Sequence, residues 1–410
     1  MKNYVIIGNG AAAVGAIEGI RSVDTDSKIT VISAENRHVY CRPLISYYLE
    51  GRTDKTRMLY RPEDFSAKNG VTVIYGEKAA KIDPEKKTVA LESGKERKYD
   101  SLCVATGSSP FVPPTEGLEN VSKIHTFMTL DDAEGLEHDL TPDSKVLIIG
   151  AGLIGLKCAE GILGRCASVT VCDLAPRVLS SILDDDCAAI MQNHLEKMGI
   201  EFLLDDTAAK FEGGKAVMKS GKTVDFDVLV MAVGVRANTS LIKDIGGEVG
   251  RGILVDDAMK TSLDCIFAAG DCTESFDITS ESRKVMAIMP LAYMQGHCAG
   301  VNMAGGEESI TNALPMNSIG FAGLHCMTAG RYTGECYEER SDGKIKRLFT
   351  ENNLLKGFIL IGDNDRAGIY TSLIRNKTPL DTVDFGLLKK SPSLAPFGKA
   401  YRTEKLGGVV

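Results

Sequence analysis

The chain has 410 residues, more than one ordinary hydrophobic core, and this length indicates about three domains. Its net charge of −8 argues against nucleic-acid binding, and no apolar run approaches the roughly 18 residues of a membrane span. The 11 cysteines include no C-x-x-C pair, so neither a disulfide framework nor a metal site is expected. Reduced thiols and the lack of a signal-peptide pattern predict a cytoplasmic protein.

The first dinucleotide-binding pattern starts at the apolar run 4–7, which is typical of a buried parallel strand. A G-x-G-x-x-A turn follows and leads into a predicted helix over 13–21. Gly8 permits the tight turn, Gly10 lets the backbone approach a pyrophosphate, and Ala13 is small enough for helix and strand to pack. The helix N-terminus would then face the phosphates with unpaired N–H groups.

An acidic residue follows the second predicted strand, as this dinucleotide-binding pattern requires. The predicted strand 28–33 is followed by Glu35, 20 residues past Gly15, the place of an acid that binds a ribose 2′-OH. Strand, turn, helix, strand and acid in register favour a dinucleotide site over a glycine turn without a ligand.

The segment up to residue 114 contains further strands and a second glycine motif. Residues 71–75 form a short β-type run, and 79–82 with 88–91 read as a hairpin. The apolar run 100–105 ends in Thr106-Gly107, and three prolines between 110 and 114 indicate a crossover.

The dinucleotide pattern then repeats. The strand 146–149 leads into a complete G-x-G-x-x-G formed by Gly150, Gly152 and Gly155, and 156–163 is the predicted helix. Two matched units in one chain are hard to explain without two nucleotide ligands.

The acid of the second unit bears on the choice of nucleotide. Asp173 ends the strand 169–172, 18 residues beyond Gly155. A carboxylate accepts from a free 2′-OH and repels a 2′-phosphate, which favours NADH. Arg177 could assist a 2′-phosphate, which keeps NADPH as an alternative.

The pattern of predicted secondary structure changes twice in the remaining chain, at residues 311 and 384. The strand 227–232 precedes Gly234, and Ile266 begins an apolar run that ends in Gly270-Asp271. A helix is predicted over 291–303, followed from 311 by β-rich segments and a helix over 370–375. Residues 384–410, with two prolines and several glycines and serines, are predicted to be an extended tail.

With these residues in view, the chain resembles the two-dinucleotide-binding flavoproteins, the pyridine nucleotide–disulfide oxidoreductases, over residues 1–380. The resemblance implies an α/β fold with two Rossmann-like domains, as in glutathione reductase, and a small α+β C-terminal domain. It implies FAD and NAD(H) as cofactors, with NADP(H) less favoured. The cofactor-binding residues that it implies, together with those argued above, are Gly8, Gly10, Ala13, Glu35, Arg42, Pro43, Ala105, Thr106, Gly107, Gly150, Gly152, Gly155, Asp173, Gly234, Gly270 and Asp271.

The turn Tyr40-Cys41-Arg42-Pro43 narrows the resemblance to one branch of the family. It is similar to the corresponding turn of NADH-dependent rubredoxin and ferredoxin reductases and of the flavin part of nitrite reductases. The resemblance places Arg42 near the flavin ring; the alternative is that Arg42 only fixes the loop before Pro43. Leu153 and Lys157 depart from the family's Tyr and Glu, and Lys157 either pairs with a carboxylate or is a surface lysine.

The domain prediction follows from the order of the motifs. Residues 1–112 and 239–310 are expected to form a discontinuous FAD domain, into which the NAD(P)H domain 113–238 is inserted. A C-terminal domain over 311–383 and the tail 384–410 complete the chain.

Three functions remain open. The first is an enzyme that passes electrons from NADH through FAD to a protein partner, namely a rubredoxin, a ferredoxin or an iron–sulfur subunit. The second is an NADH oxidase or coenzyme A-disulfide reductase, with Cys41 as its redox thiol and Arg42 beside it as catalytic candidates. The third is a flavoprotein scaffold that senses NADH. A homodimer or a complex with an iron–sulfur subunit is also expected.

Overall fold

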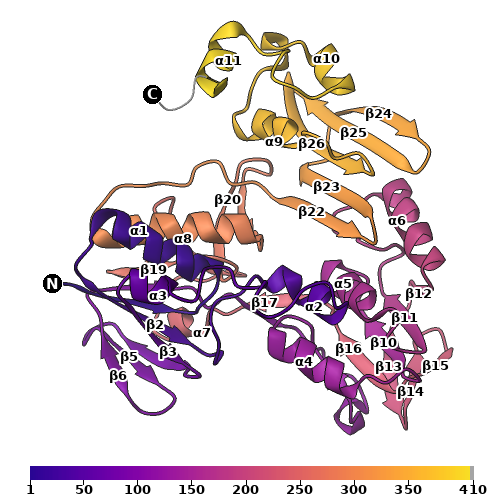
Figure 1. Cartoon of the computed structure of the whole chain (residues 1–410), viewed down its shortest axis with the longest axis horizontal. Coiled ribbons are helices and arrows are strands. Elements are labelled where there is room, and N and C mark those ends of the chain that lie inside the picture. Colours follow the sequence, from indigo (N-terminus) through magenta and orange to yellow (C-terminus); the bar gives the residue numbers. More distant parts are fainter. Residues whose placement is uncertain (407–410) are drawn as a thin grey trace. The chain divides into compact units, whose positions relative to one another are not determined.

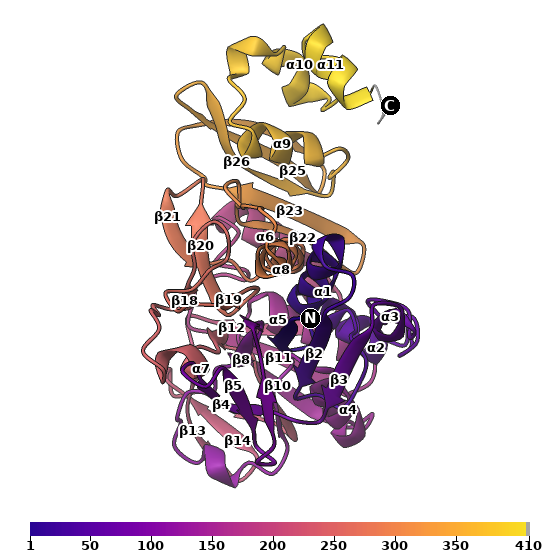
Figure 2. The ribbon, with the colours of Figure 1, turned by 90° about the vertical axis from the view of Figure 1, so that its left-hand side faces the viewer.

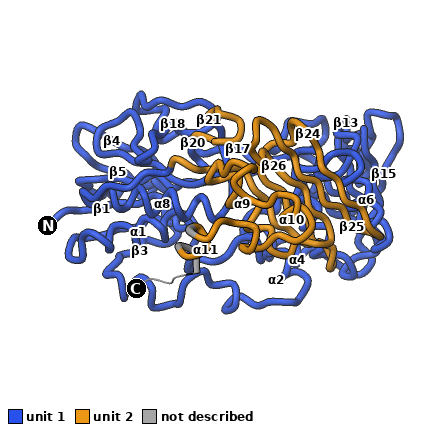
Figure 3. Tube along the Cα trace, turned by 90° about the horizontal axis from the view of Figure 1, so that it is seen from above, with its two compact units in different colours: residues 1–275, 284–310 blue, residues 276–283, 311–410 orange. Residues whose placement is uncertain are grey.

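The computed structural model describes residues 1–406, with the backbone alone for residues 400 and 404–406. Its contacts divide it into two compact units, drawn in different colours in Figure 3. The first unit comprises residues 1–275 and 284–310, and the second comprises residues 276–283 and the chain from 311 onward.

The first unit contains two parallel sheets of five strands each (Figure 1). In the first sheet the strand order is β19-β7-β1-β2-β3, and the central β1 is buried over four of its five residues. A strand buried on both faces reads as a continuous apolar run, which is what the sequence has there. The strands of this sheet are β1 (Asn3–Ile7), β2 (Lys28–Ser33), β3 (Val71–Tyr75), β7 (Ser101–Val104) and β19 (Ile266–Ala268).

The second sheet repeats this arrangement, with the order β12-β11-β10-β16-β9. Its central β10 precedes the second glycine loop, as β1 precedes the first. The predicted α/β fold with two Rossmann-like sheets is therefore confirmed. The strands of the second sheet are β9 (Ile124–His125), β10 (Lys145–Ile149), β11 (Ser168–Asp173), β12 (Ile200–Leu204) and β16 (Val228–Met231).

A helix follows each glycine loop, and both helices begin earlier than expected. Helix α1 (Ala11–Val23) and helix α5 (Leu153–Ile162) begin directly after the second glycine of each motif, whereas the sequence predicted starts at 13 and 156. The loop residues Ala and Leu have high helix propensity, so the helix extends back to the glycine. The other helices of this unit are α2 (Ile45–Leu49), α3 (Phe65–Lys68), α4 (Leu130–Asp139), α6 (Asp185–Lys197), α7 (Ser240–Lys243) and α8 (Met289–Ala304), with short 3₁₀ turns at Arg42–Leu44 and Leu118–Asn120.

Helices α1 and α8 lie side by side although they are far apart in sequence (Figures 1 and 2). A Cβ at Gly296 of α8 would lie 1.9 Å from the backbone oxygen of Ala12, and one at Gly15 of α1 would lie 2.2 Å from that of Tyr293. The two backbones are therefore in direct contact, which only glycine permits. This contact holds the C-terminal part of the unit against the helix of the first glycine loop.

Smaller antiparallel strands complete the first unit. The predicted hairpin is present as β4 and β5, joined by β6 in a three-stranded sheet, and β8 pairs with β17. No helix within residues 1–406 is long and apolar enough to cross a membrane. The remaining strands are β4 (Ala79–Asp83), β5 (Thr88–Leu91), β6 (Glu96–Lys98), β8 (Ser108–Pro110), β13 (Ala208–Glu212), β14 (Lys215–Met218), β15 (Thr223–Asp225), β17 (Val235–Ala237), β18 (Ile253–Leu254), β20 (Thr273–Asp277) and β21 (Ser282–Val285).

The second unit is built on an antiparallel sheet with the order β22-β23-β26-β25-β24. Its core includes the fully buried Phe358 of β26 and Tyr370 of α9, whose rings lie 5.8 Å apart. The elements are β22 (Met316–Phe321), β23 (Leu324–Gly330), β24 (Glu335–Ser341), β25 (Lys344–Glu351), β26 (Leu354–Ile361), α9 (Gly368–Arg375), a 3₁₀ turn at Leu380–Thr382, α10 (Phe385–Lys390) and α11 (Lys399–Leu406).

The tail was expected to be extended, and this expectation is wrong for its described part, which contains α10 and α11. Asp384 caps α10 by accepting from the N–H of Leu387 at 2.9 Å. Leu388 and Phe397 are buried in the core of the second unit, so this segment packs as part of a fold. Residues 407–410 of the predicted tail lie outside the described part of the chain.

The two predicted cofactor domains fall within the first unit except for residues 276–283 of the predicted FAD domain. The C-terminal unit begins at 311 as expected but also takes in residues 276–283. The finer division of the first unit into FAD and NAD(P)H domains stays a prediction.

Candidate functional site

The first and third glycines of each loop are required by the protein's own backbone. Gly8 and Gly150 have φ of 114° and 119°, and a Cβ would lie 2.1 Å and 2.3 Å from the backbone oxygens of Ala105 and Ala232. A Cβ at Gly155 would lie 2.0 Å from the oxygen of Gly150, and Ala13, at the same place in the first loop, is fully buried. These positions therefore set the turn and the packing of helix on strand.

The second glycine of each loop has no such constraint. Gly10 and Gly152 have φ of −107° and −83°, which any residue adopts, and a Cβ at either would meet no described atom within 4 Å. Each residue is the N-cap of its helix, and neither helix has a side-chain cap. In the described part of the chain the N–H groups of the first turns, at residues 11–13 and 153–155, have no acceptor, which is the donor arrangement that binds a pyrophosphate. The residues present fit two dinucleotides.

Glu35 is engaged by side chains of the following turn. It accepts a hydrogen bond from the hydroxyl of Tyr40 at 2.7 Å and forms an ion pair with Arg42. The Tyr40 hydroxyl in turn accepts from the N–H of Leu130 at 2.8 Å, and Arg42 donates to the backbone oxygen of Met128 at 3.2 Å. The structure thus brings the predicted ribose acid and the predicted flavin-side arginine into direct contact, which the sequence did not indicate.

Cys41 lies in the same turn, directly before the 3₁₀ turn that contains Pro43. Its Sγ is 3.9 Å from Sδ of Met289, and no disulfide is formed by any of the 11 cysteines. Burial raises the pKa of the Cys41 thiol, against a smaller opposite effect from the backbone N–H of Leu44. Arg42 pairs with Glu35 and does not contribute to this shift, so the thiol stays protonated at neutral pH.

Asp271 lies close to the first glycine loop. The preceding Gly270 donates its N–H to the buried Gln295 at 2.8 Å, and a Cβ on Gly270 would lie 3.0 Å from the Cβ of Ala12 in the first turn of α1. Burial raises the pKa of Asp271, and the charge of Arg42 acts in the opposite direction. The first loop, Arg42 and Asp271, predicted from separate motifs, therefore meet at one place.

Residues 105–107 and Gly234 lie where the chain crosses between the two sheets. Ala105 donates to the oxygen of Ile7 at 2.8 Å, which joins β7 to the strand of the first loop. Asn238 accepts from the hydroxyl of Thr106 and donates to its oxygen, both at 2.9 Å, and its own N–H reaches the oxygen of Gly107 at 2.9 Å.

The backbone of Gly234 completes this crossover. Its φ is 112° and its oxygen accepts from Phe111 at 2.9 Å. Asn238, which the sequence did not single out, thus joins the two crossover strands by its side chain and its backbone.

Asp173, at the end of β11, forms hydrogen bonds with the second glycine loop. Its two carboxylate oxygens accept from the N–H groups of Ala151 and Ala175 at 2.7 and 2.8 Å. Arg177 is held by an ion pair with Asp185 at 2.9 Å and by a hydrogen bond to the oxygen of Leu183 at 3.1 Å. The negative group therefore lies at the loop, and the nearby cation already has partners.

Lys157 lies one turn into α5 and is not a plain surface lysine. It forms an ion pair with Glu160, whose side chain is only 3% exposed, and its Nζ lies 4.6 Å from the ring centroid of Tyr47 on α2. Of the two readings left open by the sequence, the carboxylate partner is the one found.

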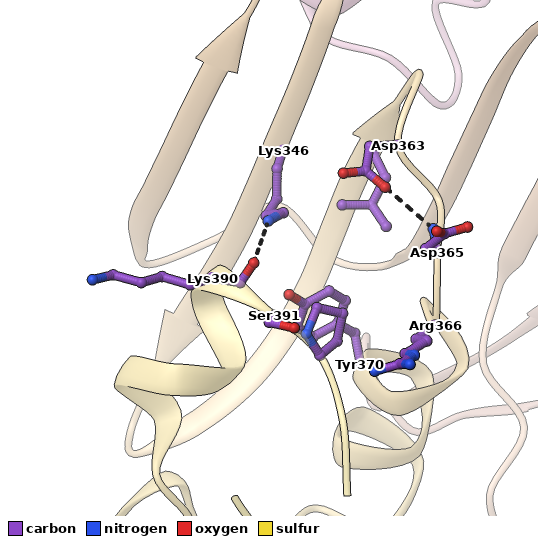
Figure 4. Close-up of a pocket in the computed structure, with 9 residues that line it drawn as sticks. Lys346, Asp363, Asp365, Arg366, Tyr370, Lys390 and Ser391 are labelled. Carbon is purple, nitrogen blue, oxygen red and sulfur yellow. Dashed lines mark hydrogen bonds between the residues drawn. The ribbon is translucent and has the colours of Figure 1, made fainter. Parts of the chain in front are cut away.

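A pocket of about 320 Å³ lies in the second unit, between β25, β26, α9 and the end of α10 (Figure 4). Lys346, Arg366 and Lys390 line it together with Asp363 and Asp365, so its charges are mixed. The Nζ of Lys346 also donates to the backbone oxygen of Lys389 at 3.1 Å and to that of Lys390 at 3.5 Å, at the end of α10. The pocket contains no predicted site residue and no glycine loop, so we do not assign the nucleotide chemistry to it.

The family assignment follows from comparison with known proteins. Residues 2–296 match the family model described as pyridine nucleotide-disulphide oxidoreductase. Because the match covers more than half of the chain, the protein belongs to this family and is an oxidoreductase, as the resemblance implied. Membership implies a flavin and a pyridine nucleotide as cofactors.

Several named relatives are similar to the chain. It is 31% identical over 393 residues to the epsilon subunit of the NADH-dependent phenylglyoxylate dehydrogenase of Aromatoleum evansii, covering 92% of both chains. It is 31% identical over 396 residues to the NADH oxidase of Methanocaldococcus jannaschii, covering 87% of both. It is 31% identical over 274 residues to the rubredoxin–NAD(+) reductase of Pseudomonas putida, covering 65% of this chain and 71% of that one.

A solved structure has the same fold. Putidaredoxin reductase, in its covalent complex with putidaredoxin, superimposes with a TM-score of 0.87 at 22% identity, over 95% of this chain and 96% of that one. At this identity the likeness concerns the fold alone. The predicted relationship to the rubredoxin reductases is confirmed by the match to rubredoxin–NAD(+) reductase.

Proposed function

We propose that this protein is an electron-transfer flavoenzyme that takes electrons from NADH through FAD and passes them to a protein redox partner. The observation that carries the proposal is the pair of open, uncapped helix N-termini at Gly10 and Gly152 within one compact unit. Hydride uptake from a nicotinamide, followed by release of single electrons, is the chemistry that a bound flavin supplies. The first loop, with Gly270 and Asp271 against it, would hold FAD, and the second loop would hold NADH.

The second loop favours NADH over NADPH. The carboxylate of Asp173 lies at the loop and would repel a 2′-phosphate. Arg177, the one cation that the sequence offered for a 2′-phosphate, is held by Asp185 and by the oxygen of Leu183. A 2′-phosphate would have to break this ion pair before Arg177 could bind it.

Several relatives support a protein acceptor. The names of the rubredoxin reductase and of the epsilon subunit describe proteins that work with other polypeptides, and the putidaredoxin reductase structure holds its redox partner. We therefore infer a rubredoxin, a ferredoxin or an iron–sulfur subunit as acceptor. A homodimer or a stable complex with such a subunit is compatible with this function.

The second candidate is an NADH oxidase or coenzyme A-disulfide reductase, because one relative is named NADH oxidase. Attack on a disulfide needs a thiolate. Burial raises the pKa of Cys41, and the cation beside it is paired with Glu35, so the thiolate is disfavoured. This argues against the thiol route; turnover with oxygen alone would not need Cys41.

The test uses the purified protein and its Cys41→Ser variant. The wild type should be yellow and should bleach anaerobically with NADH, and the variant should do the same. Both should reduce a rubredoxin or ferredoxin faster than a low-molecular-weight disulfide or oxygen. Rising salt should slow that protein reaction, because charged docking surfaces are screened.

Three outcomes would contradict the proposal. Disulfide turnover that Cys41→Ser abolishes while bleaching survives would establish the thiol route. Preference for oxygen over every protein carrier would establish an oxidase. Slow turnover with all acceptors, artificial ones included, would leave the NADH-sensing scaffold.

A further inference from the structure

The side chain of Tyr40 lies between the predicted ribose acid and the start of a helix. Tyr40 is buried, and its hydroxyl forms hydrogen bonds with two groups, the carboxylate of Glu35 and the backbone N–H of Leu130. Leu130 is the first residue of α4, and its side chain is buried as well. The hydroxyl therefore joins the turn after β2 to an element 90 positions further along the chain.

The two partners of the Tyr40 hydroxyl fix the direction of its proton. A backbone N–H can only donate, so the hydroxyl oxygen accepts from Leu130 at 2.8 Å and its proton points to Oε2 of Glu35 at 2.7 Å. Burial raises the pKa of Tyr40, against an opposite effect from the charge of Arg42, so the hydroxyl keeps this proton. The N–H of Leu130 lies at the positive end of α4, and successive hydrogen bonds strengthen one another. Glu35 thus receives a directed and polarised donor.

The turn that carries Glu35 lies beside the first glycine loop. The N–H of Gly8 donates to the oxygen of Ile32 at 2.8 Å, and the side chain of Asn9 donates to the oxygen of Arg37 at 3.4 Å. The carboxylate and the open N–H groups of α1 therefore belong to one site, at which the ribose and the pyrophosphate of a single dinucleotide would bind.

The carboxylate of Glu35 keeps acceptor capacity after these contacts. Tyr40 binds one of its oxygens and Arg42 binds the other. An ionised carboxylate offers about four acceptor positions, so each oxygen retains one for a ribose hydroxyl. A ribose hydroxyl needs the carboxylate to stay in one orientation, and the buried Tyr40 is the neighbour that holds it there.

We propose that Tyr40 is a positioning residue for FAD, which holds the Glu35 carboxylate so that it accepts from the 2′-hydroxyl of the adenosine ribose. The inference deepens the proposed function and rests on it. The backbone of Tyr40 suits this role because it is fixed in place. Tyr40 forms an antiparallel bridge with Leu59, and the N–H of Cys41 donates to the oxygen of the buried Met58 at 2.8 Å.

The experiment compares FAD with the analogue whose adenosine ribose lacks the 2′-hydroxyl. The full-length protein is freed of flavin, and the change in flavin fluorescence on rebinding gives a Kd for each compound. The wild type should bind FAD about 10- to 100-fold more tightly, because the analogue loses a hydrogen bond to a charged group. In Tyr40→Phe this ratio should fall about 3- to 10-fold, as expected for the loss of one hydrogen bond. Glu35 can then turn toward Arg42, whose side chain is 43% exposed and less confined.

Two further variants separate positioning from a merely structural role. Tyr293→Phe removes a tyrosine–glutamate hydrogen bond of similar length, to Glu18 at 2.6 Å, and should leave the ratio as in the wild type. In Glu35→Gln the ratio should already be low. Adding Tyr40→Phe to Glu35→Gln should lower it little further, because both changes act through one contact.

The results that would overturn this inference differ from those that would overturn the proposed function. A Tyr40→Phe protein that keeps the wild-type ratio, or that loses affinity for both compounds equally, would refute the role of Tyr40 while NADH still bleaches the bound FAD. If Tyr40→Phe does not fold, a wild-type ratio in Glu35→Gln would refute it instead. A wild type that binds neither compound would overturn both the inference and the proposed function.

Discussion

The replacement Gly152→Ala separates what the fold requires from what the ligand requires. Gly155 is a glycine because a Cβ would lie 2.0 Å from the backbone oxygen of Gly150. Gly152 has an ordinary backbone conformation and open space around its Cβ position. The fold by itself would therefore tolerate alanine at position 152. We expect that a glycine is needed there because the bound nucleotide approaches the backbone.

The two expected effects differ in size. An alanine at an N-cap costs up to about 1 kcal/mol relative to glycine. The smaller conformational freedom of the unfolded chain offsets about 0.4–1 kcal/mol of this, so the net change in stability is close to zero. The added methyl group would stand between the first-turn N–H groups and the pyrophosphate. Loss of one such charge-assisted hydrogen bond, about 1.5–3 kcal/mol, weakens NADH binding about 10- to 100-fold.

The assay is anaerobic stopped-flow reduction of the flavin at increasing NADH concentration, combined with thermal unfolding. Gly152→Ala should raise the apparent Kd for NADH and leave the unfolding midpoint and the flavin content as in the wild type. Gly155→Ala is the matched control and should lose about 1–3 kcal/mol of stability through overpacking. The reasoning is refuted if Gly152→Ala binds NADH normally, or if it is destabilised as much as the control.

Two further predictions concern stability. Gly296→Ala should destabilise the first unit by at least about 1–3 kcal/mol and lower its flavin content, since the new Cβ would lie 1.9 Å from the oxygen of Ala12. Chemical denaturation and the flavin-to-protein absorbance ratio measure these two effects, and Met294→Ala, at an exposed position of the same helix, is the control. Hydrogen bonds from Ser27, and further ones from Tyr4 and Asp26, hold the pKa of Asp24 well below its usual 3.8. The stability that this carboxylate contributes is thus present above about pH 4 and lost as the pH falls toward its pKa in the folded protein. Asp24→Asn should therefore be less stable than the wild type at pH 7, and this difference should vanish in acid. Chemical denaturation at several pH values measures it.

The glycine loops could be predicted from sequence because their signal is local. An apolar run, a fixed glycine spacing and an acid at the end of the next strand all lie within about 35 residues, and backbone sterics couple them. The structure explains the first glycine of each loop, because a side chain at Gly8 or Gly150 would meet the backbone of Ala105 or Ala232. Helix starts were less certain, because the last loop residues are also good helix formers.

Contacts between distant segments could not be predicted in the same way. The hydrogen bond of Arg42 to Met128 joins residues 86 positions apart, and the hydrogen bonds of Asn238 to Thr106 join residues 132 positions apart. The composition of the tail suggested an extended chain, but Leu388 and Phe397 reach the core of the second unit. In each case long-range packing, which the local sequence does not encode, decided the outcome.

The contact between α1 and α8 explains how separate motifs become one site. Glycines on both helices allow the backbones to touch, which fixes α8 along the helix of the first loop. Gln295 of α8 accepts from the N–H of Gly270, so the position of α8 sets the position of the segment that carries Asp271. The first loop and Asp271, more than 250 residues apart in sequence, are thereby held together by the backbone packing of α1 on α8 and by the side chain of Gln295. Because rigid backbone contacts keep their geometry better than long side chains do, we expect the first loop to be preformed for its cofactor.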